Sequence, residues 1–117
     1  RDRLSAMNAR IMGRDADPFY GAPVVLVVLA DKSRGTYLYD GSLVMGNLML
    51  AAHAEGLGSC WIHRAKEEFE SEEGKAILKE LGIEGDYEGI GHCILGYADG
   101  PAPEAKPRKA DYVKWVE

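Results

Sequence analysis

The thiols and imidazoles of this sequence are the side chains that could do chemistry or bind a metal. Cys60 and His63 form a Cys-x-x-His pair, and His92 is followed directly by Cys93. The four residues are formally a zinc-binding set. Neighbours on a strand point to opposite faces, however, so His92 and Cys93 could not easily reach one ion. A metal-binding module is therefore kept only as an alternative.

Cys60 alone is a weak candidate nucleophile. A reactive cysteine needs a nearby base and a positive environment, and His63 and Arg64 follow it closely. Side chains three positions apart on an extended strand do not converge. Catalysis by the thiol is not expected.

The most concentrated positive charge lies near the end of the chain, at Lys106, Arg108 and Lys109. Arginine could bind a phosphate through two hydrogen bonds, and lysine could act as a point charge. The residues by themselves favour a solvated tail over such a phosphate-binding clamp.

The sequence Gly89-Ile90-Gly91 is a poor match to the dinucleotide-binding motif Gly-x-Gly-x-x-Gly. The position of the third glycine is occupied by Ile94, and the segment lies within a predicted strand.

Composition limits the remaining possibilities. With 117 residues, 46% of them hydrophobic, the chain has the size of one domain, which we assign to residues 1–117. The net charge of −5 opposes nonspecific binding to nucleic acid or to an anionic membrane. The longest apolar run, Val24–Ala30, is too short to span a bilayer. We expect a soluble intracellular protein whose two cysteines form no disulfide framework.

Helical periodicity at Leu4, Met7, Ile11 and Met12 predicts a first helix that ends at Gly13. The run Val24–Ala30 predicts a strand that is buried on both faces. The next helix should begin near 40–42, be capped by Asp40 or Ser42, and end at Gly56. It is apolar almost all round, so a second subunit should cover part of it.

The rest of the chain is predicted as a short strand, two helical segments, a glycine-containing strand and a tail. The strand should span 58–62 and be followed by a helical turn at 66–69. Ser71 should cap a helix through Leu81, with Ala76, Ile77 and Leu81 facing inward. A third strand is expected at 89–97. The proline-containing tail should be extended from Asp99, with a last strand or short helix at 112–116.

Four segments in succession resemble the nitroreductase family of FMN-dependent oxidoreductases. They are FYGAP with the apolar strand at 19–30, DGSLVMGNLMLAAHAEGLGSCWIHR at 40–64, EGIGHCILGY at 88–97, and the basic tail at 106–109. Their order and separations match the C-terminal half of that family. The resemblance implies an α+β, three-layer fold with a mainly antiparallel central sheet flanked by helices. It also implies a homodimer with FMN at the interface.

Carried over by position, the resemblance assigns roles to residues at three places in the chain. It implies that the segment Ser59, Cys60, Trp61, Ile62, His63 and Arg64 passes along the isoalloxazine ring, largely through backbone N–H groups. Lys106 and Arg108 would bind the FMN phosphate, with Lys109 as the substitute if the register shifts by one. Tyr20 and Gly21 would line the substrate side. No catalytic side chain and no metal are expected, because the flavin carries the hydride chemistry.

One family segment has no counterpart here. Family members begin with an Arg- and Ser-rich segment that binds the flavin phosphate and ribityl chain, whereas this sequence begins near the middle of such an enzyme. We therefore expect a partial domain.

The prediction is a cytoplasmic FMN-dependent enzyme that passes a hydride from NAD(P)H through FMN to a nitroaromatic, quinone or similar acceptor. Two alternatives remain: a noncatalytic flavin-binding or regulatory remnant of the fold, and the Cys/His metal-binding module.

Overall fold

A three-stranded antiparallel sheet forms the centre of the molecule in the computed structural model, which describes residues 1–117. Strand β3 (Tyr87–Gly96) lies between β1 (Val24–Asp31) and the edge strand β2 (Gly58–Ile62). The register pairs Val27 with His92 on one side and Trp61 with Cys93 on the other. Because β2 is an edge strand, one side of its backbone has no neighbouring strand.

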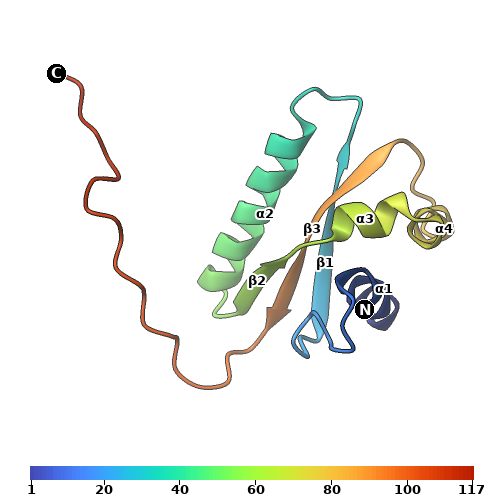
Figure 1. Ribbon diagram of the computed structural model, residues 1–117, viewed down its shortest axis with the longest axis horizontal. Helices are drawn as coiled ribbons and strands as arrows, with labels where there is room; N and C mark the ends of the chain where they lie inside the picture. The colour runs from blue at the N-terminus through green and yellow to red at the C-terminus, as the bar shows by residue number, and fades with distance from the viewer.

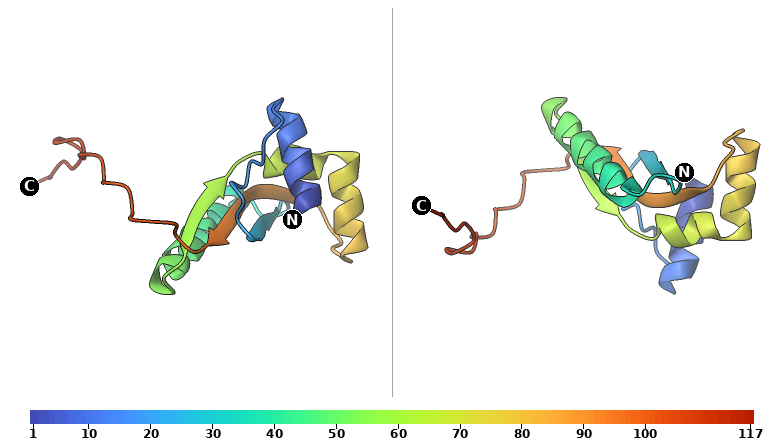
Figure 2. Two further views of the ribbon diagram at one scale, coloured as in Figure 1. Left: turned by 90° about the horizontal axis from the view of Figure 1, so that it is seen from below. Right: turned by 90° about the horizontal axis from the view of Figure 1, so that it is seen from above.

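Helices cover both faces of this sheet (Figures 1 and 2). Helix α2 (Tyr37–Ala54) packs against one face and contacts all three strands. The other face is covered by α1 (Asp2–Met12), α3 (Ala65–Glu70) and α4 (Glu72–Glu80). This arrangement confirms the predicted α+β fold with a central antiparallel sheet flanked by helices.

Alternation along the strands divides the core between the two faces. Val28 and Cys93 pack with Met45 of α2 on one face. Phe19, Ile62 and Ile94 form a second cluster on the opposite face. Since successive strand residues point to opposite sides, each strand contributes to both clusters.

The amphipathic first helix and its glycine end are confirmed. Gly13 follows α1 with φ 68°, the left-handed conformation in which a glycine commonly ends a helix. The Ser71 cap is also confirmed, because its Oγ accepts a hydrogen bond from the backbone N–H of Gly74 at 3.0 Å.

The start of α2 was predicted too late. The helix begins at Tyr37, so Asp40 lies in its first turn, and Ser42 lies in its interior and donates to the Leu38 carbonyl at 2.6 Å. The Tyr37 hydroxyl donates to Glu88 of β3 at 3.3 Å. We attribute the extra turn to this tertiary contact, which cannot be read from local sequence.

Two burial predictions were wrong, one of them in part. The buried residues of α4 are Gly74 and Leu78. Ile77 packs against the core as predicted, but Ala76 and Leu81 are exposed. A Cβ at position 74 would lie 2.0 Å from the Glu68 carbonyl oxygen. The close approach of α3 therefore determines which side of α4 faces inward.

Strand β1 is only partly buried, and Val24 and Leu26 are exposed. It ends the sheet instead of lying at its centre.

Residues 97–117 extend away from the sheet without forming a helix or strand (Figure 1). The predicted extended tail is confirmed, but the predicted last strand or helix at 112–116 is absent. None of the helices is both long enough and apolar enough to cross a bilayer.

Candidate functional site

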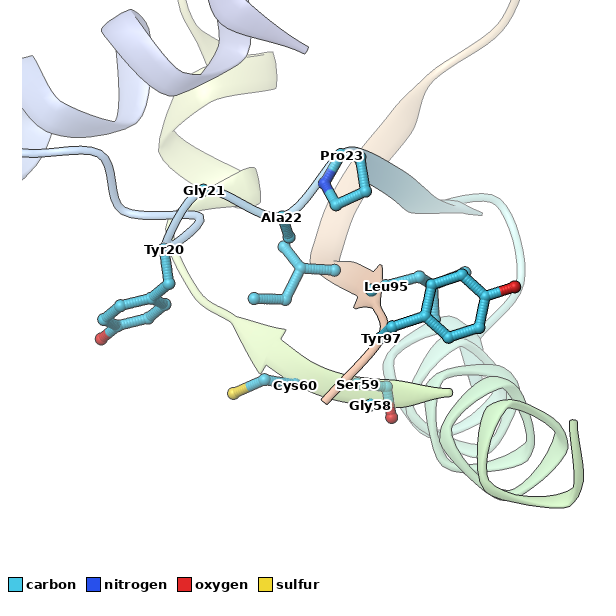
Figure 3. Close-up of a pocket in the computed structure, with 11 residues that line it drawn as sticks. Tyr20, Gly21, Ala22, Pro23, Gly58, Ser59, Cys60, Leu95 and Tyr97 are labelled. Atoms are coloured by element: carbon cyan, nitrogen blue, oxygen red, sulfur yellow. The ribbon is translucent and has the colours of Figure 1, made fainter. Parts of the chain in front are cut away.

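A pocket of about 300 Å³ lies beside the start of β2 and the end of β3 (Figure 3). Its wall contains four of the predicted site residues: Tyr20, Gly21, Ser59 and Cys60. Tyr97 lines the pocket as well and had not been singled out. The structure therefore brings the predicted substrate-lining loop together with the first two residues of the predicted flavin-contacting segment.

Asp17 shapes the loop that carries Tyr20. Its carboxylate accepts hydrogen bonds from the backbone N–H groups of Phe19 (3.0 Å) and Gly21 (2.8 Å) and from the Ser5 hydroxyl (2.7 Å). It also forms an ion pair with Arg1. Burial by itself would raise the pKa of Asp17, but these hydrogen bonds outweigh it and hold that pKa well below its usual range. The carboxylate is therefore ionised at neutral pH.

The loop holds Tyr20 in an unusual conformation. Its φ of 52° lies in the left-handed region, which non-glycine residues seldom adopt, and its side chain is 81% exposed. The phenol lies at the mouth of the pocket in Figure 3. An exposed aromatic ring there can contact a planar ligand.

The side chains of the predicted flavin-contacting strand point in two directions. Cys60 is exposed on the pocket side, whereas Ile62 on the same face is buried against Phe19. Trp61 packs toward α2 and Met45. A Cβ at position 91 would lie 2.2 Å from the Trp61 indole nitrogen, so Gly91 makes room for this ring. The Ile62 side chain is therefore withheld from a ligand, and that of Trp61 is half-buried.

His63 and Arg64 form the turn between β2 and α3. His63 is exposed, and Arg64 has a φ of 77°. The buried side chain of Asn8 donates to the His63 carbonyl at 2.9 Å and accepts from Arg64 Nε at 2.8 Å. Asn8 was not predicted as a site residue. The signal was present, because this polar residue lies four positions after Leu4 on the apolar side of α1.

A buried histidine and glutamate support the same turn from below. His92 Nε2 lies 2.7 Å from Glu68 Oε2, and His92 Nδ1 lies 3.2 Å from the Ile62 carbonyl oxygen. Both side chains are fully buried, and the Phe19 ring lies 5.1 Å from the imidazole. His92 is therefore committed to an internal partner.

The four proposed zinc ligands do not come together. His92 belongs to one face of β3 with Glu68, while Cys93 is buried on the other face beside Met45. Burial raises the pKa of the Cys93 thiol, with a smaller contribution from Cys60, which disfavours the thiolate that binds zinc. No group of three potential ligands has a metal-binding arrangement. The structure offers the metal-binding alternative no support.

The predicted phosphate ligands Lys106 and Arg108 lie on the extended tail, as does Lys109. All three are exposed and form no ion pair within the chain. Figure 1 shows the tail leading away from the sheet, so this chain's own tail is not gathered around the pocket.

Comparison with known proteins decides the family. The model of the nitroreductase family matches residues 4–97. This chain belongs to the nitroreductase family. The match begins earlier than Phe19, where the recognisable motifs begin, so α1 is part of the family domain.

Solved nitroreductases share the fold. One with bound FMN from Bacteroides fragilis is 27% identical, with a TM-score of 0.82 over 99% of this chain and 67% of that chain. Another with bound FMN, from Desulfitobacterium hafniense, is 30% identical, with a TM-score of 0.73 over 92% of this chain and 58% of that chain.

An FMN-dependent nitroreductase from Clostridium difficile has a TM-score of 0.76 at 23% identity, over 97% of this chain and 70% of that chain, and shows the fold alone. The chain thus spans between 58% and 70% of the length of these three nitroreductases. No curated protein matches it.

Proposed function

We propose that this protein is an FMN-dependent oxidoreductase that takes a hydride from NAD(P)H and reduces a nitroaromatic, quinone or similar acceptor. Family membership supports an oxidoreductase, and two of the similar solved structures contain FMN. Bound FMN would supply the chemistry by accepting a hydride at N5 and passing electrons to the acceptor. The residues of this chain would bind and orient the ring.

The proposal rests mainly on two backbone N–H groups just after β2 that have no hydrogen-bond acceptor within the chain. The N–H groups of His63 and Arg64 donate no hydrogen bond within the chain. They lie beside the exposed edge of the strand that the family resemblance places along the flavin. Backbone donors at such a position suit a flavin ring, because they bind its heteroatoms whichever side chains are present.

The pocket at the other end of β2 suits the electron donor and acceptor. Tyr20 and Tyr97 give it exposed aromatic walls, and Ser59 and Cys60 supply its floor. Aromatic rings favour planar partners such as nicotinamide, nitroarenes and quinones. We assign Tyr20 and Gly21 to the substrate side on this basis.

Lys106 and Arg108 are proposed to bind the FMN phosphate, with Lys109 as the substitute. In a chain with a net charge of −5, an anion must be met by local cations, and these lack acidic partners. Guanidinium and ammonium groups match a phosphate geometrically and electrostatically.

The functional unit is proposed to be a homodimer formed through α2. Leu43 and Leu50 are 69% and 70% exposed on the side of α2 that faces away from the sheet. Leu38, Tyr39 and Val44 extend this apolar surface along the helix. A second copy would bury the surface and supply the cover predicted from the sequence.

We place the enzyme in the cytoplasm. Both cysteines are free thiols, which suits a reducing compartment where NAD(P)H is available.

Titration of the purified protein with FMN tests the proposed function. Stoichiometric uptake, seen as a shift of the flavin absorbance bands, followed by bleaching with NADH or NADPH and recovery with a quinone, is the expected result. FMN uptake without bleaching would indicate the noncatalytic flavin-binding alternative. A protein that remains colourless at saturating FMN would contradict the proposal.

Replacing both Lys106 and Arg108 by alanine should weaken FMN binding about 10- to 100-fold, because two charge-assisted contacts are lost. The control is Arg14→Ala with Lys79→Ala, which removes the same charge from an exposed site just after α1 and an exposed site on α4. Fluorescence titration at two salt concentrations measures both effects. Equal affinities in the two double variants would assign the tail to solvent.

A further inference from the structure

Three consecutive backbone carbonyls at the end of β2 are tied to the interior of the protein. The Ile62 carbonyl meets His92 Nδ1 at 3.2 Å, and the His63 carbonyl accepts from Asn8 Nδ2 at 2.9 Å. The Arg64 carbonyl accepts from the backbone N–H of Glu68 at 3.0 Å, which begins α3. Each peptide plane of the turn is therefore fixed.

Fixing the Ile62 and His63 carbonyls also fixes the directions of the N–H groups of His63 and Arg64. In a planar trans peptide the N–H points opposite to the C=O of the same unit. The N–H of His63 belongs to the peptide whose carbonyl faces His92, and the N–H of Arg64 to the peptide whose carbonyl faces Asn8. Both N–H groups consequently point away from the interior, and neither has a partner within the chain.

The turn needs this support because Arg64 has a φ of 77°. A left-handed conformation is sterically unfavourable for a non-glycine residue, so it persists only where the surroundings enforce it. Asn8 binds on both sides of the strained residue, through the His63 carbonyl and Arg64 Nε. The side-chain amide of Asn8 is oriented so that Nδ2 donates to the His63 carbonyl and Oδ1 accepts from Arg64 Nε.

The second anchor is equally specific. A carbonyl oxygen can only accept, so the contact with Ile62 requires a proton on His92 Nδ1. Glu68 Oε2 holds the opposite ring nitrogen at 2.7 Å and thereby fixes the ring orientation. Neither Asn8 nor the buried Glu68–His92 pair is exposed to a ligand.

We propose that Asn8, supported by the Glu68–His92 pair, is a positioning residue that aims the amides of His63 and Arg64 at the flavin ring. This inference rests on the proposed function, because it assigns the two amides to FMN. Asn8 comes from α1 and acts through the turn, without touching the cofactor.

The test compares Asn8→Ala and Asn8→Asp with the wild-type full chain. Both lose the donor to the His63 carbonyl, whereas aspartate keeps an acceptor for Arg64. FMN should bind about tenfold more weakly in both variants. The loss should be about tenfold larger again for reduced FMN, which corresponds to a decrease of about 30 mV in the two-electron potential.

Met7→Ala is the matched control. Met7 precedes Asn8 on α1 and is 3% exposed, but it makes no hydrogen bond to the turn. Adding Arg64→Gly to Asn8→Ala should restore part of the lost affinity, because glycine adopts a positive φ without the steric cost. Backbone carbon chemical shifts of residue 64, measured without FMN, report the change of φ directly.

The positioning role is supported by a lower potential in the Asn8 variants, an unchanged potential in Met7→Ala, and recovery in the double variant. Equal effects of Asn8→Ala and Met7→Ala, or an Asn8→Ala variant with wild-type affinity and potential, would overturn it while leaving the proposed function intact. A wild-type protein that takes up no FMN overturns the proposed function instead, even if the residue 64 shifts still depend on Asn8.

Discussion

The two non-glycine residues with positive φ, Tyr20 and Arg64, both lie at the candidate site. Each is held by a polar side chain near the N-terminus, the exposed Asp17 for Tyr20 and the buried Asn8 for Arg64. Asp17 receives the amides around Tyr20, and Asn8 binds on both sides of the Arg64 turn. Strained backbone concentrated at a ligand site and enforced by specific hydrogen bonds indicates preorganisation.

Replacing Asp17 by asparagine should lower the free energy of unfolding by about 1 kcal/mol at neutral pH, because its charge-assisted contacts with Ser5 and the loop amides are weakened and solvent already screens this exposed carboxylate. Urea unfolding measures the effect. Asp15→Asn, an exposed change in the same segment, should leave stability unchanged.

The pH dependence of this difference has a definite sign. The pKa of Asp17 is lowered in the folded protein, so its contribution is complete above the unfolded value of about 3.9 and is lost as the pH falls toward the folded value. The gap between wild type and Asp17→Asn should therefore be smaller at pH 3 than at pH 7. A gap that grows on acidification would contradict the assigned role.

At the scale of the elements, hydroxyl groups that look alike in sequence have different roles. Ser71 caps α4 by accepting from the Gly74 N–H, and it donates to the Glu68 carbonyl at 2.5 Å. Ser42 lies inside α2 and only returns a hydrogen bond to its own helix. The cap also joins α3 to α4, and α3 carries the glutamate that supports the β2 turn.

Ser71→Ala should lower the free energy of unfolding by about 1 kcal/mol, because the first turn of α4 loses its acceptor. Ser42→Ala is the matched control and should be neutral or slightly stabilising, since alanine is the better helix former. Thermal unfolding of the two variants distinguishes them. A Ser71→Ala variant as stable as the wild type would show that the cap is energetically unimportant.

At the scale of the whole molecule, the apolar outer side of α2 has no cover within the chain. One side of this helix packs on the sheet through Met45 and Ala52, while Leu43 and Leu50 remain exposed. Such a surface on a small domain is expected to mediate association.

Leu43→Glu should convert the proposed homodimer to a monomer, because a charge in an apolar interface costs several kcal/mol unless it is paired. Sedimentation equilibrium gives the mass. The control is Leu81→Glu, which changes an equally exposed leucine, 69% in both cases, at the end of α4. A wild-type monomer, or dissociation by both variants alike, would remove α2 as the interface.

Local chemistry in the sequence was sufficient to predict most elements, the Gly13 and Ser71 helix ends, and the order of the strands along the chain. These depend on neighbouring residues: apolar spacing, caps and helix breakers. The succession of motifs also predicted the family. The tertiary structure decided which side chains act, because Asn8 meets a turn 55 positions away and His92 meets a glutamate 24 positions away. It also decided that the Trp61 side chain faces α2. Successive side chains of a strand point to opposite faces, but which face is covered depends on the neighbouring strand and on the helix packed against the sheet.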